Sequence, residues 1–197
     1  MKKRRVIVGI TGASGAVYGM ALLAALKSTG TVETHLVMSE AGKDLLRLEL
    51  GAGSVKKAQE LADKIYDNND LAAPISSGSF ITEGMVIAPC SAKTLSAVAH
   101  AYGDTLMHRA ADVVLKERRK LLLLFRETPF HLMHIENMAL VTRMGAIVLP
   151  PIPAFYHKPA SIEDLVNHSI GKVLDLLSLE HALFRRWGSG GRDSVKS

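Results

Sequence analysis

The residues best suited to chemistry in this sequence stand where apolar runs stop. The segment 11–15 (TGASG) follows the apolar run 6–10, and the segment 89–94 (PCSAKT) follows the apolar run 85–88. Both segments carry small or hydroxyl side chains and lead into a helical pattern. Backbone N–H groups at the start of a helix, aided by a hydroxyl, bind phosphate well. The two segments therefore indicate anion-binding turns.

Each of these turns also has a purely structural interpretation, which the pattern alone leaves open. The glycines at 9, 12 and 15 are three residues apart, not in the G-x-G-x-x-G spacing of dinucleotide folds, and suit a tight turn against a closely packed helix. Ser91 is a good helix N-cap by itself. The run 32–38 ends at Ser39, where an NAD site would carry an acidic residue. The pattern thus counts against a dinucleotide.

A charged pair, Arg126 and Glu127, directly follows the apolar run 121–125. Such pairs are usually surface ion pairs of little energy. This pair, however, stands at the end of an expected strand, where a substrate would bind. Cys90 is expected to be a small buried residue and not a nucleophile, because no histidine stands near it in the sequence. The histidines show no H-E-x-x-H motif or Cys/His metal spacing, so no metal site is expected.

The composition excludes several other classes of protein. With 48% hydrophobic and 22% charged residues, the 197-residue chain has enough apolar surface to fold. The net charge of +5 suits anionic partners, but the densest basic run, 116–120, includes an acid, which favours a phosphate-binding enzyme over a nucleic-acid binder. The single cysteine fits a reducing compartment. Without an apolar run of about 18 residues, we expect a cytoplasmic protein with no membrane partner.

Strand-like and helix-like segments alternate along the chain. The expected strands are 6–10, 32–38, 85–88, 121–125 and 146–149, and the expected helices are 16–27, 40–50, 54–65, 91–101, 106–119, 132–143 and 161–177. This alternation predicts an α/β fold, a parallel sheet with helices on both faces and ligands beyond the carboxyl ends of its strands. We expect one domain over 1–187 and a flexible tail over 188–197.

An apolar stripe on the expected helix 131–143 suggests self-association. Leu132, Ile135, Met138 and Ala139 recur on one face of this helix. Aromatic residues make up only 5% of the chain, so its apolar mass is aliphatic, and part of it is expected to lie between subunits. The stripe also suits a helix that simply covers the sheet. We expect a homo-oligomer.

Taken together, these segments resemble the UbiX-type flavin prenyltransferases. The resemblance is carried by GITGASGAVYG (9–19), HLVMSEAG (35–42), SGSF (77–80) and the long segments 85–138 and 145–177. It covers nearly the whole chain, up to RRWG at 185–188. The segment that contains RETP and ends in HIENM is the specific part, whereas the glycine turn alone would not be.

The resemblance implies both a fold and a reaction. The fold is flavodoxin-like or Rossmann-like, with a site built at trimer interfaces, usually within a dodecamer. The reaction joins the dimethylallyl group of dimethylallyl monophosphate to N5 and C6 of reduced FMN, without a metal. The product, prenylated FMN, serves a UbiD-type decarboxylase in ubiquinone synthesis or aromatic-acid metabolism.

The resemblance also assigns roles to individual residues. The expected FMN contacts are Gly12, Ala13, Ser14, Ser39, Ser91, Ala92, Lys93, Thr94 and Arg126. Glu49, Lys116 and Glu127 match the polar residues around the leaving phosphate, Tyr156 and Lys172 match those that hold the prenyl phosphate, and Trp187 matches an aromatic wall. At position 172 the family has arginine. Lysine keeps the charge but loses the bidentate fork, so this contact is expected to be looser.

These residue types suit the implied chemistry. Breaking an allylic C–O bond develops negative charge on the phosphate, which Lys116, Lys172 and the Tyr156 hydroxyl can stabilise. Positive charge on the prenyl carbon can be stabilised by the Trp187 ring. Ring closure then requires a base that removes a proton from the flavin carbon. Glu127 and the released phosphate are both candidates for that base.

Three other functions remain as alternatives. A flavin-dependent decarboxylase of peptidyl cysteine shares this fold, but its P-x-M-N-x-x-M-W segment is missing from the sequence. An aromatic-acid decarboxylase and a non-catalytic flavin carrier are the others. The set Glu49, Lys116 and Glu127 argues against a passive carrier. The sequence leaves open whether the prenyl donor is a monophosphate or a diphosphate.

Overall fold

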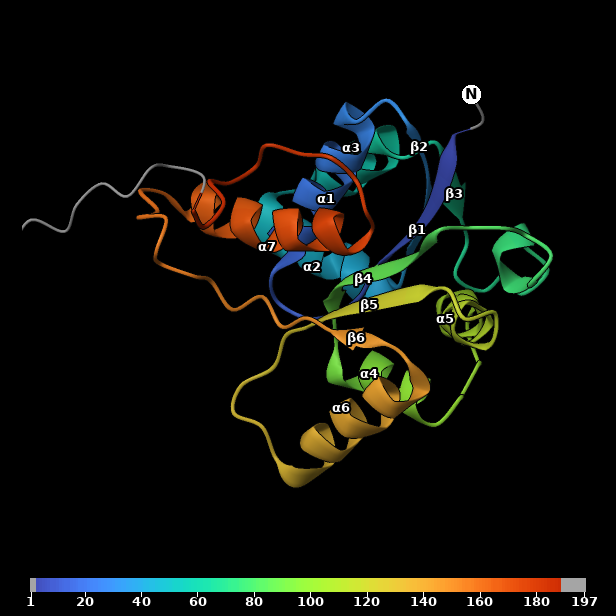
Figure 1. Cartoon of the computed structure of the whole chain (residues 1–197). Coiled ribbons are helices and arrows are strands. Elements are labelled where there is room, and N and C mark those ends of the chain that lie inside the picture. The colour runs from blue at the N-terminus through green and yellow to red at the C-terminus, as the bar shows by residue number, and fades with distance from the viewer. Residues whose placement is uncertain (1–2, 189–197) are drawn as a thin grey trace, which may run out of the picture.

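The computed structural model describes residues 3–188, and within this range six strands form one sheet in which all neighbours are parallel. The strands are β1 (Arg4–Ile10), β2 (Val32–Met38), β3 (Lys64–Tyr66), β4 (Gly84–Cys90), β5 (Lys120–Phe125) and β6 (Ile147–Val148). Their order across the sheet is β3-β2-β1-β4-β5-β6 (Figure 1). Apart from Gly188, the expected tail 188–197 lies outside the described residues.

The strand order reverses between β1 and β4, at the centre of the sheet. From β1 the chain adds strands toward one edge, and from β4 it adds them toward the other. A crevice opens at such a reversal, beyond the carboxyl ends of the strands, and holds the ligand in doubly wound folds. Apart from the three-residue edge strand β3, the order is that of flavodoxin. The predicted α/β fold class is confirmed.

Helices cover both faces of the sheet (Figure 1). They are α1 (Ala16–Ser28), α2 (Glu40–Leu50), α3 (Ser54–Leu61), α4 (Ala92–Ala99), α5 (Leu106–Lys116), α6 (Leu132–Met144) and α7 (Ile162–Leu176), with a 3₁₀ turn at Pro74–Ser76. α1 packs against α2, α3 and α7 on one face, and α4 packs against α5 and α6 on the other. α7 starts at a capping box formed by Ser161 and Asp164.

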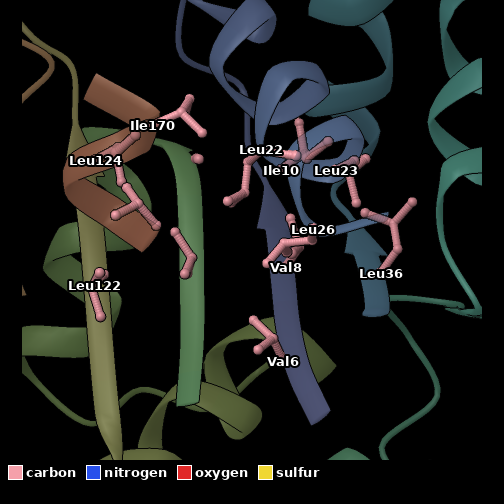
Figure 2. Close-up of a cluster of buried hydrophobic side chains, with 14 of the residues drawn as sticks. Val6, Val8, Ile10, Leu22, Leu23, Leu26, Leu36, Leu122, Leu124 and Ile170 are labelled. Carbon is pink, nitrogen blue, oxygen red and sulfur yellow. The ribbon is translucent and has the colours of Figure 1, made fainter. Parts of the chain in front are cut away.

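The core lies on both sides of β1, the strand between β2 and β4. Val6, Val8 and Ile10 pack with α1 and α7, and Figure 2 shows these side chains gathered between the sheet and the helices. Ile7 packs on the opposite face with α4 and α5. Because both faces are buried, the strand has no polar alternation. This explains why β1 is a continuous apolar run in the sequence.

Two expected elements end in the wrong place. The helix predicted over 54–65 stops at Leu61, and Lys64–Tyr66 forms the edge strand β3 against β2. Pairing with a neighbouring strand decides this segment, and a local charge pattern does not report such pairing. Pro89 was expected to end its strand, yet β4 continues to Cys90, which pairs with Phe125 beyond a register shift. A proline is tolerated at such an irregularity.

Two glycines bring α2 against the end of β1. A Cβ atom on Gly42 would lie 2.4 Å from the carbonyl oxygen of Ile10, and one on Gly12 would lie 2.5 Å from the Cβ atom of Ala41. Both distances are shorter than real carbon contacts, so neither position accepts a side chain without movement of the backbone. The start of α2 is thereby fixed against the β1–α1 turn.

We predict that Gly42→Ala destabilises the protein by about 1–3 kcal/mol, the usual cost of overpacking. Gly42 lies inside α2, where alanine would otherwise be favoured by up to about 1 kcal/mol. The added methyl group meets main-chain atoms, which cannot rotate away. Urea unfolding measures the difference.

The matched control is Gly53→Ala, because Gly53 has a negative φ and open space where the Cβ atom would lie. Equal stability of the two variants would show that α2 can shift away from β1 at little cost.

Candidate active site

A cavity of about 500 Å³ lies at the carboxyl ends of the central strands. Its size is in the range of cofactor sites. It is lined by Thr11, Gly12, Ser39, Glu40, Ala41, Asn68, Ser91, Ala92, Lys93, Thr94, Thr105, Met107, His108 and Glu127. Seven residues predicted to contact FMN or substrate are in this lining, namely Gly12, Ser39, Ser91, Ala92, Lys93, Thr94 and Glu127. The structure therefore brings most of the predicted flavin contacts together.

The hydroxyl of Thr11 joins the two strands between which the order reverses. It donates to the carbonyl of Pro89 at 2.8 Å and accepts from the N–H of Ser91 at 2.9 Å. Thr11 is buried. The sequence analysis treated this residue only as part of the turn, although a polar residue directly after a buried strand is a usable signal. Thr11 fixes where α4 begins.

The start of α4 combines a helix cap with an anion site. Ser91 Oγ accepts from the N–H of Thr94 at 3.3 Å and lies 3.1 Å from its hydroxyl. The N–H groups of Ala92 and Lys93 belong to the first turn, where no helical partner exists, and both residues line the cavity. Ser91 is thus the N-cap, and the helix start also faces the space where an anion would bind.

The start of α1, in contrast, already holds an anion from the chain itself. The carboxylate of Glu49 accepts from the N–H of Gly15 at 3.0 Å and from the N–H of Ala16 at 2.8 Å. Ser14 and Ala13 lie in this turn but outside the cavity lining. The phosphate expected at the glycine turn therefore meets N–H groups that Glu49 already occupies. The resemblance assigns Glu49 to the leaving phosphate, and in this chain it caps α1.

The side chain of Arg126 has an unpaired hydrogen-bond donor that a ligand could satisfy. Its main-chain N–H donates to the carbonyl of Cys90 at 3.1 Å, which fixes its place beside β4. Its Nε atom is buried and has no hydrogen-bond partner among residues 3–188. A buried donor without an acceptor costs about 1–3 kcal/mol. Arg126 is not among the residues that line the cavity, but the next residue, Glu127, is. A phosphate or carbonyl oxygen of FMN bound beside Glu127 would satisfy the Nε atom, so the surroundings of the cavity fit this group.

The residues predicted to hold the prenyl phosphate form a separate cluster beside α7. Tyr156 and Trp187 meet edge to face with ring centroids 5.3 Å apart, and the Tyr156 hydroxyl lies 3.4 Å from Nε2 of His168. The Nζ atom of Lys172 lies 4.0 Å from the Oδ2 atom of Asp175. Trp187 is 82% exposed, so it is no wall of an enclosed site within one chain.

Lys116 lies at the opposite end of the sheet from Glu127. It ends α5, just before β5 begins, and pairs with Glu117 next to Gly78. Arg109 reaches the same loop, with its Nε atom 3.3 Å from the carbonyl of Ser76. Arg109 is not among the predicted site residues, although its spacing of seven residues from Lys116 places both on one helix face. One chain does not bring Glu49, Lys116 and Glu127 together.

Two titratable residues near these sites have shifted pKa values. Burial raises the pKa of the Cys90 thiol, which is fully buried, so the expectation that Cys90 is not a nucleophile is consistent with its surroundings. The pKa of His168 is lowered, first by burial and then by the charges of His157 and Lys172. His168 therefore presents a neutral ring to Tyr156 over much of the physiological range.

Residues 3–188 contain neither a membrane-spanning helix nor a metal-binding cluster. No helix in that range is long and apolar enough to cross a membrane. The same residues contain no group of three His, Cys, Asp or Glu side chains placed to hold a metal ion.

Comparison with known proteins identifies the family. The model of the Flavoprotein family matches residues 1–174. The chain is 53% identical over 186 residues to the flavin prenyltransferase UbiX of Escherichia coli K12, covering 93% of this chain and 98% of that protein. It is 51% identical over 194 residues to UbiX of Thauera aromatica, covering 98% and 99%. The chain belongs to the UbiX-type flavin prenyltransferases.

Solved UbiX structures have the same fold as this chain. A UbiX in complex with FMN and dimethylallyl pyrophosphate gives a TM-score of 0.92 at 47% identity, covering 95% of this chain and 99% of that one. A dodecameric FMN-dependent UbiX-like decarboxylase from Escherichia coli O157:H7 gives 0.90 at 50% identity, covering 93% and 98%. A PPC decarboxylase, at 18% identity and a TM-score of 0.62, shares the fold alone.

We predict that Thr11→Val lowers the unfolding free energy of this UbiX-type chain by about 1–3 kcal/mol, because the buried N–H of Ser91 loses its acceptor. FMN affinity should fall as well, since the start of α4 is no longer held. Urea unfolding and FMN titration measure the two effects.

The control is Thr142→Val. The hydroxyl of Thr142 donates to the carbonyl of Met138 on the exposed side of α6, so we expect a change within about 0.5 kcal/mol. A Thr11→Val variant as stable as this control would show that the bridge between β1 and β4 contributes nothing.

The lowered pKa of His168 predicts a loss of stability in mild acid. As the pH falls below about 6.5, the unfolded chain binds a proton at this histidine before the folded chain does, so folding becomes less favourable. His168→Gln removes this titration. The slope of unfolding free energy against pH, measured from about pH 6.5 to 5, should be smaller in the variant, and identical slopes would contradict the shift.

Proposed function

We propose that this enzyme joins the dimethylallyl group of a dimethylallyl phosphate to N5 and C6 of reduced FMN, which is a substrate. One observation carries the proposal. The free N–H groups of α4 and the side chain of Glu127 line one cavity at the carboxyl ends of the strands, and half-buried Arg126, whose Nε atom is unpaired among residues 3–188, directly precedes Glu127. Support comes from UbiX relatives of about half identical sequence, one of which was solved with FMN and dimethylallyl pyrophosphate.

Glu127 is the group in this cavity best placed to move a proton. The Nε donor of neighbouring Arg126 suits the flavin. Within residues 3–188, the carboxylate of Glu127 accepts only from the next main-chain N–H, that of Thr128, at 3.0 Å. Its other oxygen is left for a reacting group. When the allylic C–O bond breaks, the phosphate would leave with the electron pair and N5 would bond to the freed prenyl carbon and lose its proton. The second bond would form as the prenyl double bond takes up a proton at one carbon and bonds to C6 through the other, after which C6 loses a proton. Glu127 or the released phosphate would take that proton.

We infer that a complete site needs two or more copies of the chain. Glu127 lies at the carboxyl ends of the strands, whereas Lys116 ends α5 at the opposite end of the sheet, and the cluster of Tyr156 and Trp187 lies apart from both. Anion-stabilising cations from one copy would complete the cavity of another. A homododecamer would provide such contacts, and one relative is described as dodecameric.

The apolar stripe on α6 supports the same inference. Leu132 is 65% and Ile135 is 51% exposed, so these members of the stripe do not cover the sheet. We assign them to contacts between copies, with Met138 half-buried at the boundary. The alternative interpretation, in which the stripe is simply core, fails for its exposed half.

The proposal extends to the use of the product, the bounds of the functional domain and the location of the enzyme. The product would serve a UbiD-type decarboxylase, in ubiquinone or aromatic-acid metabolism. The functional domain would be 1–187. A cytoplasmic location remains a prediction from the single cysteine.

An anaerobic turnover assay tests the function. The purified protein is given reduced FMN with dimethylallyl monophosphate or diphosphate, and the flavin is analysed by mass and absorbance. We expect a flavin heavier by one prenyl group, with two new bonds. Flavin that stays unchanged with both donors would contradict the proposal and favour a non-catalytic flavin carrier.

We predict that Glu127→Gln and Lys116→Gln each slow prenyl transfer by about 10²- to 10⁴-fold, because each removes a charge that acts on the reacting groups. FMN binding should remain nearly normal in the Lys116 variant, whose side chain lies outside the cavity. Single-turnover rates and FMN titration measure the two properties.

Mixing the two variants tests the shared site. If the groups come from different copies, co-assembled variants contain some sites with both native side chains, and activity reappears. Mixed oligomers as inactive as the separate variants would contradict this arrangement. A Glu127→Gln rate within a few-fold of wild type would move the role of base to the phosphate.

A further inference from the structure

A buried histidine in the wall of the cavity has no role in the function described above. His108, on the first turn of α5, lines the cavity together with Lys93 and Glu127. Its side chain is only 7% exposed, and its Nδ1 atom lies 2.6 Å from a carboxylate oxygen of Asp104. Neither residue belongs to the predicted set of site residues. The pair therefore calls for a functional explanation.

The main chain of α5 is fully engaged at this point. The N–H groups of Leu106 and Met107 donate to the carbonyl and side-chain oxygens of Asn68 at 2.8 and 3.1 Å, and the N–H of His108 meets the hydroxyl of Thr105 at 3.4 Å. In contrast to α4, this helix start offers no N–H group to a ligand. What α5 brings to the cavity is side chains.

Asp104 decides which nitrogen of His108 is available. A carboxylate accepts only, so Nδ1 carries the proton, and Nε2 is the ring atom left over. Nε2 has no hydrogen-bond partner among residues 3–188. It is also not enclosed by protein, in contrast to the ring nitrogens of His157, which are buried without partners. A bound molecule in the cavity can therefore reach it.

We propose that Nε2 of His108 makes a hydrogen bond to FMN bound in this cavity, with Asp104 as the positioning residue that fixes the ring. The inference rests on the proposed function, because it requires FMN at the carboxyl edge of the sheet. FMN presents acceptors on its phosphate and ring and donors on its ribityl chain. The ribityl hydroxyls both donate and accept, so they suit the free Nε2 atom.

A neighbouring cavity provides a competing explanation and a control. His108 and Lys93 also line a smaller space of about 380 Å³, whose wall includes His100 and Tyr102. His100 is exposed, and its Nδ1 atom is paired with the carbonyl of Ser96 at 2.9 Å. A ligand of the smaller cavity would depend on His100 and His108 alike, whereas FMN in the larger cavity depends on His108 alone.

The experiment is titration of the purified full-length protein with FMN, comparing wild type with four variants. We expect His108→Ala to weaken FMN binding about tenfold, the value of one hydrogen bond from a buried partner. His108→Gln, whose amide nitrogen reaches the place of Nε2, should recover most of the affinity. Asp104→Asn should lie between them, and His100→Ala should match wild type.

Steady-state assays and thermal unfolding separate binding from folding. Loss of a flavin contact raises KM for reduced FMN while kcat changes little. A merely structural role would lower the thermal midpoint and would not be rescued by glutamine. The inference is overturned if His108→Ala binds FMN within twofold of wild type, or if His100→Ala loses as much affinity as His108→Ala.

The proposed function can fail separately. Wild-type protein that binds FMN but never prenylates it would overturn the function and leave the His108 contact standing. Wild-type protein that does not bind FMN at all would overturn both.

Discussion

The hydroxyl of Thr11 is the contact on which the rest of the site depends. β1 and β4 are the neighbouring strands between which the strand order reverses. Their carboxyl ends must be held side by side for a crevice to form beyond them. A single side chain with both a donor and an acceptor achieves this, because it bonds to the carbonyl of Pro89 and to the N–H of Ser91. The start of α4, and thus the free N–H groups that face the cavity, is set by this contact.

The two helix starts beside this contact are used in different ways. At α1 the chain supplies its own carboxylate, Glu49, from the last turn of α2. At α4 a hydroxyl serves as the cap, and the positive end of the helix dipole remains available to a ligand. The same local geometry therefore gives a closed structural joint in one place and an open binding position in the other.

Much of the fold follows from local pattern. β2 and α2 have the bounds predicted for them, and α7 lies within one residue of its predicted bounds at each end. Residues that directly follow a strand, such as Ser39 and Glu127, reach the cavity because parallel strands bring their carboxyl ends to one edge. The family resemblance was confirmed by comparison, whereas the catalytic roles assigned to individual residues remain predictions.

What the sequence did not predict depends on distance in the chain. β3 forms only because β2 offers an edge, and Glu49 caps a helix that begins 33 residues earlier. His108 looked like one residue of an amphipathic helix, since its link to Asp104 has the i, i+4 spacing of an ordinary surface pair. Only the burial of His108 in the cavity wall distinguishes this pair from an ordinary surface pair.

The contact between Gly12 and α2 also determines how this pocket can be redesigned. In the wall, Gly12 leaves no room for a side chain against Ala41, and behind it Gly42 leaves none against the main chain of Ile10, so a side chain at either position displaces the strand end and the helix together. A library that diversifies Gly12 alone would consist largely of poorly folded members. The wall formed by Met107 and His108 is made of side chains on α5, whose start is held separately by Asn68. Selection for a flavin analogue of different shape should therefore start on that side.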